Sequence, residues 1–341
     1  MTQSSATISI AGTDIAYECP AGDTILRAGL RAGIGLPYEC SVGSCGTCKI
    51  ELVSGEAETA WAEAPGLTER DRARGRRLAC QSRSLGPCTI KARPAANYIA
   101  PVSPRRRQAR LVSARPLTHD MREFVFETDG EAAFTPGQYA LIEFGPGIGP
   151  RAYSMSNLPN ARGEWRFVIK RAPGGKGTGM LFDKVALGAT FELDGPFGLA
   201  FYRPSERDVL CVAGGSGLSP IVSIVRAAAA DPGMAGRRIR LFFGGRTPAD
   251  LCAEDELKAQ PGFGTRISHM AAVSDLEAAA RAGWSGPTGF IHGVVEAELG
   301  DALASHEIYF AGPPAMADAT HKMLVLGRKV PVAQIHFDRF Y

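Results

Sequence analysis

A nine-residue segment with three cysteines, C-S-V-G-S-C-G-T-C at residues 40 to 48, constrains the possible fold of this chain more than any other feature. Four residues separate Cys40 from Cys45, and two separate Cys45 from Cys48. The N-terminus has no basic segment followed by an apolar core, so we expect a chain without an export signal. Clustered thiols in such a chain are more often metal ligands than disulfide partners, and a metal site of this kind needs a fourth thiolate.

Cys80 is the candidate for the fourth ligand. It follows an arginine-rich segment, and 31 residues lie between Cys48 and Cys80. The resulting set, C-x4-C-x2-C-x31-C, predicts a plant-type 2Fe-2S cluster. Gly43 and Gly46 suit a loop wrapped around two irons, because glycine adopts backbone angles that other residues avoid. The alternative is a tetrahedral zinc site, but zinc sites usually present two C-x2-C pairs, and only one is present here.

The composition is that of a globular protein. Of the 341 residues, 45% are hydrophobic and 21% are charged, a length and balance that allow two or three domains. A net charge of +3 gives no argument for binding nucleic acid or a membrane surface, and no apolar run approaches the roughly 18 residues that span a bilayer. We therefore expect a cytoplasmic monomer that binds neither. The remaining cysteines stand alone and are expected to be small buried hydrophobic residues: Cys19, Cys88, Cys211 and Cys252.

The first 95 residues predict a small α+β domain, and the resemblance of its cysteine spacing to plant-type ferredoxins implies a β-grasp ferredoxin fold. Short strand patterns at 7–10, 48–52 and 89–92 alternate with one helical stretch at 24–32, for which Asp23 is the expected N-cap. Residues 96–107 concentrate prolines and arginines and predict a linker, with its arginines exposed to solvent as a hinge.

The remaining sequence predicts two further domains, so the fold class is multidomain, α+β and α/β. Residues 108–203 carry short strands ended by glycine, proline or asparagine, which indicate an antiparallel β-barrel. Residues 204–341 carry apolar strands at 209–213, 239–243 and 308–311, each followed by glycine or proline and an apolar helix. This alternation is typical of a parallel α/β sheet that binds a nucleotide.

The motifs in these two domains resemble the ferredoxin-NADP reductase superfamily, in the form with a plant-type ferredoxin fused ahead of the reductase. The resemblance covers essentially the whole chain. The motifs that carry it are Pro136-Gly137-Gln138-Tyr139, Arg151-Ala152-Tyr153-Ser154, Gly174-Gly175-Lys176-Gly177-Thr178, Gly195-Pro196-Phe197-Gly198, Gly214-Gly215-Ser216-Gly217-Leu218-Ser219-Pro220 and Gly312-Pro313-Pro314-Ala315-Met316.

The resemblance implies six strands for the barrel and an FAD site on it. Arg151 would bind the flavin pyrophosphate with its planar fork of donors, Tyr153 would lie against the flavin, and Ser154 would hydrogen-bond the ring nitrogen that receives hydride. Thr178 matches the residue that holds the pyrophosphate at a helix N-terminus. Phe340 aligns with the terminal aromatic residue that covers the flavin. The other FAD-binding candidates are Val168, Lys170, Gly175 and Lys176.

The resemblance also implies a nicotinamide nucleotide site in the last domain. The pyrophosphate would lie on the backbone N–H groups of the glycine-rich run, with Gly214, Gly215, Ser216 and Gly217 as candidates, together with Gly312 and Pro313. Ala311 stands where the family commonly has cysteine and is a catalytic candidate with Ser154 and Tyr153. The resemblance points to NADH, whereas Arg246, after the second strand, leaves NADPH open because an arginine there can hold a 2'-phosphate.

Electron counting orders the cofactors. A hydride carries two electrons and an iron-sulfur centre accepts one, so we expect NADH, FAD, the cluster and an external acceptor in that order. The acceptor implied by the resemblance is an oxygenase hydroxylase component or an intermediary ferredoxin. The segments 36–40, 64–67 and 335–341 resemble those of reductases that serve soluble diiron monooxygenases of the toluene or alkene type, and this is the first expectation. The segments 118–120 and 173–175 are similar to those of naphthalene-type members, so a Rieske dioxygenase is the alternative. A redox sensor or electron-storage protein is the alternative of another class, but it would not need a complete nicotinamide site.

Overall fold

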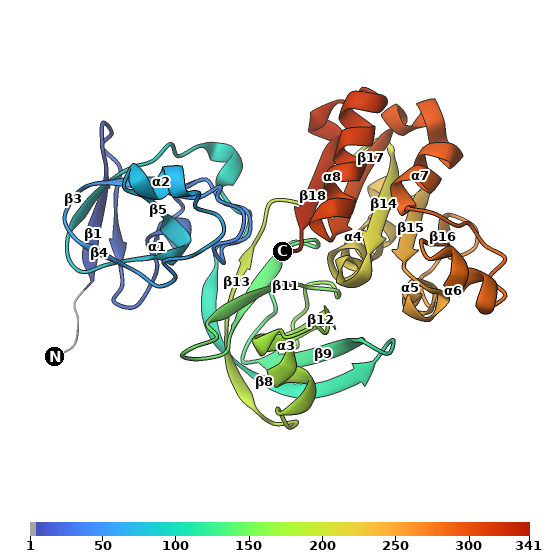
Figure 1. Cartoon of the computed structure of the whole chain (residues 1–341), viewed down its shortest axis with the longest axis horizontal. Helices are drawn as coiled ribbons and strands as arrows, with labels where there is room; N and C mark the ends of the chain where they lie inside the picture. Colours follow the sequence, from blue (N-terminus) through green and yellow to red (C-terminus); the bar gives the residue numbers. More distant parts are fainter. Residues whose placement is uncertain (1–4) are drawn as a thin grey trace. The chain divides into compact units, whose positions relative to one another are not determined.

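The computed structural model describes residues 5–341, which group into two compact units (Figure 1). The first unit contains the described part of Met1–Arg106 together with Pro150–Ala152 and Asp194–Leu199. The second contains Arg107–Gly149, Tyr153–Leu193 and Ala200–Tyr341. Two short barrel segments therefore group with the N-terminal unit, while the rest of the barrel groups with the C-terminal sheet. The domain boundaries expected at residues 95, 107 and 203 stay predictions.

The N-terminal unit is an α+β fold around one mixed sheet, as predicted. Its strands lie in the order β2-β1-β7-β3-β5, with β1 antiparallel to β2 and parallel to β7. Side chains of β1 alternate between buried and exposed, so one face covers the core and the buried helix α1. The elements are β1 (Ala6–Ile10), β2 (Ala16–Cys19), α1 (Ile25–Arg31), β3 (Lys49–Ser54), β4 (Ala57–Thr59), α2 (Glu69–Ala73), β5 (Arg76–Leu78), β6 (Ser82–Ser84) and β7 (Cys88–Lys91).

Helix α1 begins one residue later than its sequence suggests. Thr24, not Asp23, is the N-cap, and its hydroxyl accepts the Arg27 N–H. The expected cap at Asp23 is wrong because that carboxylate is almost fully buried among arginines. Arg31 contacts it through two nitrogens, at 3.1 and 2.9 Å, and Arg106 lies 2.8 Å from its other oxygen.

A second buried carboxylate, Asp194, completes this charge network in the N-terminal unit. Arg31 donates to both Asp194 oxygens, at 2.6 and 3.0 Å, and Arg27 donates at 3.4 Å. The Asp194 side chain is only 3% exposed. Burial alone would lower the pKa of Arg31, but hydrogen bonds and charges from Asp194 and Asp23 outweigh burial and raise that pKa. Arg106 is therefore held in an ion pair although its side chain is 34% exposed, which corrects the expectation of a free hinge for this arginine.

The barrel is a six-stranded sheet in the order β11-β10-β13-β8-β9-β12. Its two end strands are linked by a single antiparallel bridge between Met155 and Phe167. Strand β8 begins at Arg105, so the expected linker ends inside a central strand. Aromatic side chains fill the interior, and the fully buried Trp165 donates its indole N–H to Thr128 at 3.0 Å. The elements are β8 (Arg105–Pro116), β9 (Met121–Thr128), β10 (Tyr139–Glu143), β11 (Pro150–Ser154), β12 (Glu164–Lys170), α3 (Lys176–Asp183) and β13 (Thr190–Phe197).

The C-terminal sheet has five strands in the order β16-β15-β14-β17-β18, all parallel. The central strand β14 is buried on both faces, because alternate residues pack against α4 on one side and α7 on the other. The elements are β14 (Asp208–Gly214), α4 (Leu218–Ala230), β15 (Ile239–Gly245), α5 (Ala253–Leu257), β16 (Ile267–Val273), α6 (Leu276–Arg281), α7 (Ile291–Leu299), β17 (His306–Gly312), α8 (Pro314–Lys322) and β18 (Ile335–Arg339). Within residues 5–341, none of the helices has the length and apolarity that a membrane crossing requires.

Candidate redox sites

The four candidate cluster ligands form two pairs of thiols. Cys40 shares a hydrogen bond with Cys45, and Cys48 shares one with Cys80. A single tetrahedral zinc ion would hold all four sulfurs about 4 Å or less from one another. In the described part of the chain, three or more ligand atoms lie within 4.8 Å of one another only at a His-Asp-Asp group elsewhere, so the sulfurs do not form one such sphere. Two pairs of thiolates fit a cluster of two irons.

The loop that carries these thiols depends on glycine. Gly43 and Gly46 have φ of 92° and 79°, in the left-handed region that favours glycine. A Cβ on Gly46 would lie 2.5 Å from the Gly66 carbonyl oxygen, which is shorter than a van der Waals contact. The Gly66 N–H donates to the Gly43 carbonyl at 2.9 Å. The loop at residues 60–67 therefore packs directly against the loop that presents Cys40, Cys45 and Cys48.

Among the cluster candidates the pKa of Cys45 is lowered, whereas the Cys45 and Cys48 thiols and burial raise the pKa of Cys40 and of Cys80. A hydrogen bond from the Cys40 thiol lowers the pKa of Cys45 to about 5, with further help from Thr47. Burial raises the pKa of Cys252 to about 12 and also raises that of Cys211. Cys19 and Cys88 are buried as well, so the expectation of small buried residues is confirmed for all four isolated cysteines. A thiolate is the form that binds metal.

The candidate nucleotide site lies at the carboxyl edge of the parallel sheet, where ligands bind in open α/β sheets. Strand β14 ends at Gly214, and a 3-10 turn, Gly215–Gly217, leads into α4. A Cβ on Gly217 would lie 2.0 Å from the Ala311 carbonyl oxygen, so only glycine fits this crossing. Ala311 itself is 2% exposed and pairs with Ala213 across β14 and β17. The glycine turn and the Ala311–Pro313 segment therefore lie side by side.

A serine on α4 links this edge to the end of the barrel strand that carries the predicted flavin motif. Ser219 Oγ accepts the Val168 N–H at 3.0 Å and donates to the Ser154 carbonyl oxygen at 2.6 Å. All three residues are at least nine-tenths buried. The backbone at Ser154 is thus fixed relative to the glycine turn that precedes α4.

Two further α4 side chains continue this link at helical spacing. Ser223 Oγ donates to the Asn157 carbonyl at 2.6 Å, and Arg226 donates to the Ser156 carbonyl at 2.8 Å. Positions 219, 223 and 226 lie on one face of a helix, so α4 presents a polar row to the barrel while its other side chains fill the core. The barrel and the sheet are thus joined by hydrogen bonds as well as by apolar contacts.

Lys170 lies between the same two parts of the second unit. Its ammonium is 3.0 Å from Asp120 of the barrel and 3.8 Å from Asp250 of the sheet domain, and His119 lies 3.8 Å from Asp250. A Cβ on Gly215 would lie 3.5 Å from Lys170 Cδ, so the lysine stem passes beside the glycine turn. The His119-Asp120-Asp250 group already has this ammonium as its cation. Lys170 is therefore placed beside the nucleotide edge.

The other flavin candidates lie on separate elements of the barrel. Gly175 is the N-cap of α3, and Thr178 in its first turn accepts the Ala172 N–H at 3.2 Å and donates to the Gly175 carbonyl at 3.3 Å. Lys176 is the first residue of that helix. The ring of Tyr153 packs edge-on against Phe144, with centroids 6.4 Å apart.

Two candidates come from more distant parts of the sequence. Phe340 follows β18, and its N–H donates to the Gly312 carbonyl at 2.9 Å, which places it at the nucleotide edge. Arg246 is exposed directly after β15, at the same edge. Arg151 belongs to the N-terminal unit, is exposed, and donates to the Pro150 carbonyl at 2.9 Å.

Comparison with known proteins agrees with this three-part arrangement. Family models match at residues 8–85 (2Fe-2S iron-sulfur cluster binding domain), 108–202 (Oxidoreductase FAD-binding domain) and 211–322 (Oxidoreductase NAD-binding domain). Ferredoxin–NAD(P)(+) reductase CarAd of Metapseudomonas resinovorans is 43% identical, over 95% of this chain and 96% of the relative. The chain belongs to this family of ferredoxin–NAD(P)+ reductases.

Other relatives of this reductase agree. The ferredoxin–NAD(+) reductase component of the alkene monooxygenase system of Xanthobacter autotrophicus (strain ATCC BAA-1158 / Py2) is 39% identical, over 95% of this chain and 97% of the relative. A solved structure, the ferredoxin reductase in carbazole 1,9a-dioxygenase, has a TM-score of 0.92 and 40% identity, over 98% of this chain and 99% of that one. The resemblance to oxygenase reductases and the FAD, 2Fe-2S and NAD(P)H cofactors predicted from the sequence are confirmed.

Ala311 gives a prediction for this reductase, because it departs from the cysteine common in the family. If the thiol tightens the nicotinamide against the flavin, Ala311→Cys should speed flavin reduction by a few-fold to about ten-fold, roughly 1.4 kcal/mol at most. NADH affinity should change less, since the phosphates would be held at the glycine turn. Anaerobic stopped-flow measures both quantities. Ala279→Cys, which adds the same thiol at another buried position, is the control. An unchanged rate would show that residue 311 only packs.

Proposed function

We propose that this reductase takes hydride from NADH and delivers single electrons through FAD and the 2Fe-2S cluster to an oxygenase component, directly or through an intermediary ferredoxin. The observation that carries the proposal is the pair of hydrogen bonds made by the Ser219 hydroxyl. They fix the end of β11, the strand with the predicted flavin motif, beside the glycine turn. The chemistry that bound FAD and the cluster supply is the conversion of a two-electron hydride transfer into one-electron steps.

The residues of the nucleotide edge bind and orient the nicotinamide nucleotide in this proposal. Gly214 to Gly217 let the pyrophosphate approach backbone N–H groups at the start of α4, because three of these four residues have no side chain. Gly312 and Pro313 form the opposite wall of the site. The carbonyl oxygen of Ala311 lies beside Gly217, so Ala311 determines how closely β17 approaches the glycine turn. Lys170, beside Gly215, adds a positive charge next to the phosphates.

The barrel residues orient the flavin. We assign Arg151 and the first turn of α3, with Gly175, Lys176 and Thr178, to the flavin pyrophosphate. Tyr153 and Phe340 supply aromatic faces for the ring. Ser154 supplies the hydroxyl at the nitrogen that receives hydride, and Val168 supports it from β12. Cys40, Cys45, Cys48 and Cys80 are the proposed cluster ligands.

NADH is the proposed donor, with NADPH as the alternative. Arg246 is the residue that would bind a 2'-phosphate, since it follows β15 at the nucleotide edge. Its N–H donates to Asp250, the carboxylate that also lies near Lys170. A carboxylate near the same loop disfavours an additional phosphate, which supports NADH.

The acceptor divides into two classes. The alkene monooxygenase relative supports the soluble diiron monooxygenase favoured by the sequence, and the carbazole dioxygenase structure supports a dioxygenase of the Rieske class. We retain the monooxygenase as the first proposal. None of the eight cysteines forms a disulfide, which suits a reducing compartment and supports a cytoplasmic location. The proposed oligomeric state is a monomer.

Cofactor content and reconstitution test the proposal. Protein purified without oxygen should contain one FAD and about two irons per chain. An iron-free, zinc-loaded protein would contradict it. Mixed with NADH and either a diiron hydroxylase or a Rieske oxygenase, the reductase should support substrate oxidation by one class much faster than by the other. Turnover by the Rieske component alone would replace the monooxygenase assignment and keep the reductase function.

A further inference from the structure

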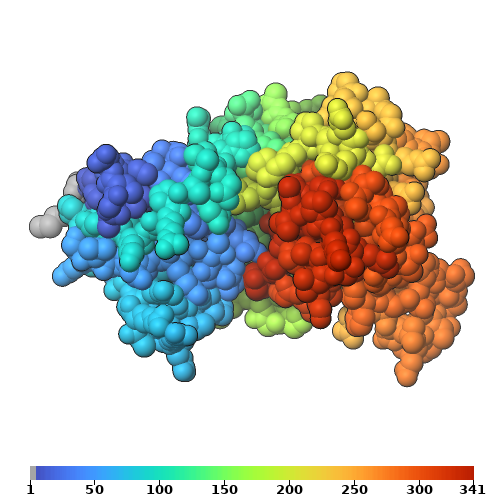
Figure 2. Space-filling view, turned by 90° about the horizontal axis from the view of Figure 1, so that it is seen from above, coloured from blue at the N-terminus to red at the C-terminus, as the bar shows by residue number. Residues whose placement is uncertain are grey.

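A group of arginines lies on the N-terminal unit, near the loop that carries Cys40, Cys45 and Cys48. Residues 70–77 contain five arginines, and this surface, with the loop at 59–67, is called the arginine face below. Figure 2 shows the lighter-blue part of the chain, which includes α2, at the molecular surface. A cavity of about 220 Å³ opens there, lined by Thr59, Ala62, Leu67, Arg72, Gly75, Arg76 and Arg77.

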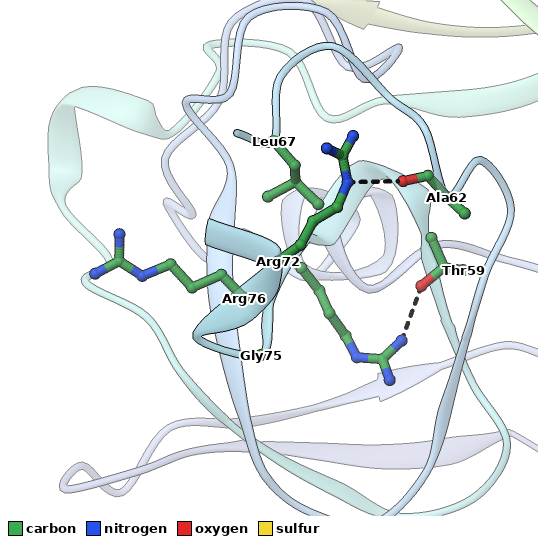
Figure 3. A pocket seen from close by; sticks show the side chains of 7 residues that line it. Thr59, Ala62, Leu67, Arg72, Gly75 and Arg76 are labelled. Atoms are coloured by element: carbon green, nitrogen blue, oxygen red, sulfur yellow. Dashed lines mark hydrogen bonds between the residues drawn. The ribbon is translucent and has the colours of Figure 1, made fainter. Parts of the chain in front are cut away.

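The arginine face is one loop away from the predicted cluster. Arg72 donates to the carbonyls of Ala62 and Ala64, at 3.3 and 3.2 Å, and so holds the loop at 60–67. Figure 3 shows Arg72 reaching toward Ala62 while Arg76 extends the other way. The same loop packs on the cluster loop through Gly66 and Gly43. A protein bound to this face would bring its own redox centre close to the cluster.

Positive charge on this face exceeds negative charge. The nearly buried Asp71 is shared between Lys49, at 2.7 Å, and Arg76, at 3.0 Å. Arg70 and Arg74 are exposed, and no carboxylate of the described residues lies within 4.0 Å of either. The segment 59–77 has five arginines and three carboxylates, and Glu51 from outside the segment lies 3.6 Å from Arg76, so Arg70 and Arg74 carry the excess positive charge. The uncompensated guanidinium groups make the surface attractive to anions.

The arrangement suits a protein surface better than a small anion. The arginines that line the cavity already use donors on the protein: Arg72 on two carbonyls and Arg77 on the Thr59 hydroxyl at 2.8 Å. They do not converge on one point as an anion cage would. Trp61, 44% exposed, lies in the same loop, and tryptophan with arginine is the combination enriched at the centres of protein interfaces.

We propose that the arginine face is the docking surface for the electron acceptor, and that the acceptor presents an acidic surface around its own redox centre. This inference rests on the proposed function and names the chemistry of its partner. Attraction between the two surfaces raises the rate of encounter, an effect that salt screens. Trp61 provides the apolar contact once the charges have brought the proteins together.

The test is a charge reversal in the full holoenzyme. Arg70→Glu with Arg74→Glu should lower kcat/KM for an acidic plant-type 2Fe-2S ferredoxin about ten-fold or more at low salt, and the loss should shrink near 1 M salt. The same variant should speed reduction of cationic cytochrome c. Reduction of ferricyanide by NADH should stay at the wild-type rate, which shows that the variant is folded and contains FAD.

A matched control changes the net charge equally at other exposed arginines. Arg93→Glu with Arg162→Glu should leave the rates of reduction of the ferredoxin and of cytochrome c near those of the wild type. If the two double variants changed these rates equally, the proposal of a docking surface would be wrong. Inhibition of the wild type, but not of the Arg70/Arg74 variant, by inorganic phosphate at constant ionic strength would show a small-anion site instead. If wild-type protein reduced neither protein acceptor, the proposed function would fail; normal wild-type transfer with an unaffected variant would remove only this inference.

Discussion

Replacing Cys45 with serine should lower the rate of electron transfer to cytochrome c or to an oxygenase about 100-fold or more. A 100-fold loss is equivalent to roughly 2.7 kcal/mol in the barrier. Reduction of the flavin by NADH should remain near wild type. The reason is that the two sites belong to different units: Cys45 lies in the N-terminal unit, whereas the glycine turn and Ser154 lie in the other. Serine keeps the size of the side chain but removes the acidic thiol whose pKa is about 5.

Stopped-flow reduction of the flavin and steady-state reduction of cytochrome c separate these outcomes. Cys88→Ser is the matched control, because Cys88 is buried in the same unit and contacts carbonyl oxygens at Glu56 and Gly86 instead of other thiols. That variant should keep both activities. Loss of NADH-dependent ferricyanide reduction in a folded, FAD-containing Cys45→Ser protein would show that the proposed order of carriers is wrong.

Removing the carboxylate of Asp194 should destabilise the N-terminal unit by about 3–5 kcal/mol, because one member of a buried charge network is lost. In Asp194→Ala, Arg31 loses two hydrogen bonds and Arg27 loses one, which leaves Asp23 to balance three arginines. Urea unfolding followed by visible circular dichroism of the 2Fe-2S cluster measures the change in this unit.

Glu58→Ala is the control for this experiment, because Glu58 lies in the same unit. It pairs with Arg83 at 3.6 Å, but about half of each side chain is exposed, 53% and 40%. Exposed pairs contribute roughly 0–1 kcal/mol, since water and salt screen them. Equal, small effects of the two substitutions would show that burial does not strengthen the Asp194 network.

The sequence was most informative where function depends on neighbouring residues. The spacing of Cys40, Cys45 and Cys48 predicts a cluster loop because all three proposed ligands come from one short loop. The apolar runs of β14, β15 and β17 predict a parallel sheet because both faces of these strands are covered. Strands β16 and β18 were missed, since they lie at the sheet edges and carry polar residues such as His269 and Asp338.

Contacts between distant residues could not be predicted in this way. Asp23 looked like a helix cap because its partner Asp194 and the bridging Arg31 are not visible in the local pattern. The arginines before residue 108 looked like a hinge for the same reason. Ser219 carried a sequence signal, as part of the glycine-rich motif, but nothing in that motif shows that its hydroxyl bonds to Ser154 on the barrel.

The polar row on α4 has a consequence for protein engineering. An exchange of the C-terminal lobe for that of a relative, made to alter coenzyme choice, would replace the helix that holds the barrel backbone. The chimaera would need hydroxyl groups at positions 219 and 223 and a hydrogen-bond donor at 226. Without them, three barrel carbonyls would lose their hydrogen bonds to α4, those of Ser154, Asn157 and Ser156. A change of coenzyme is therefore best attempted at single edge residues such as Arg246, the proposed contact of a 2'-phosphate, with α4 left in place.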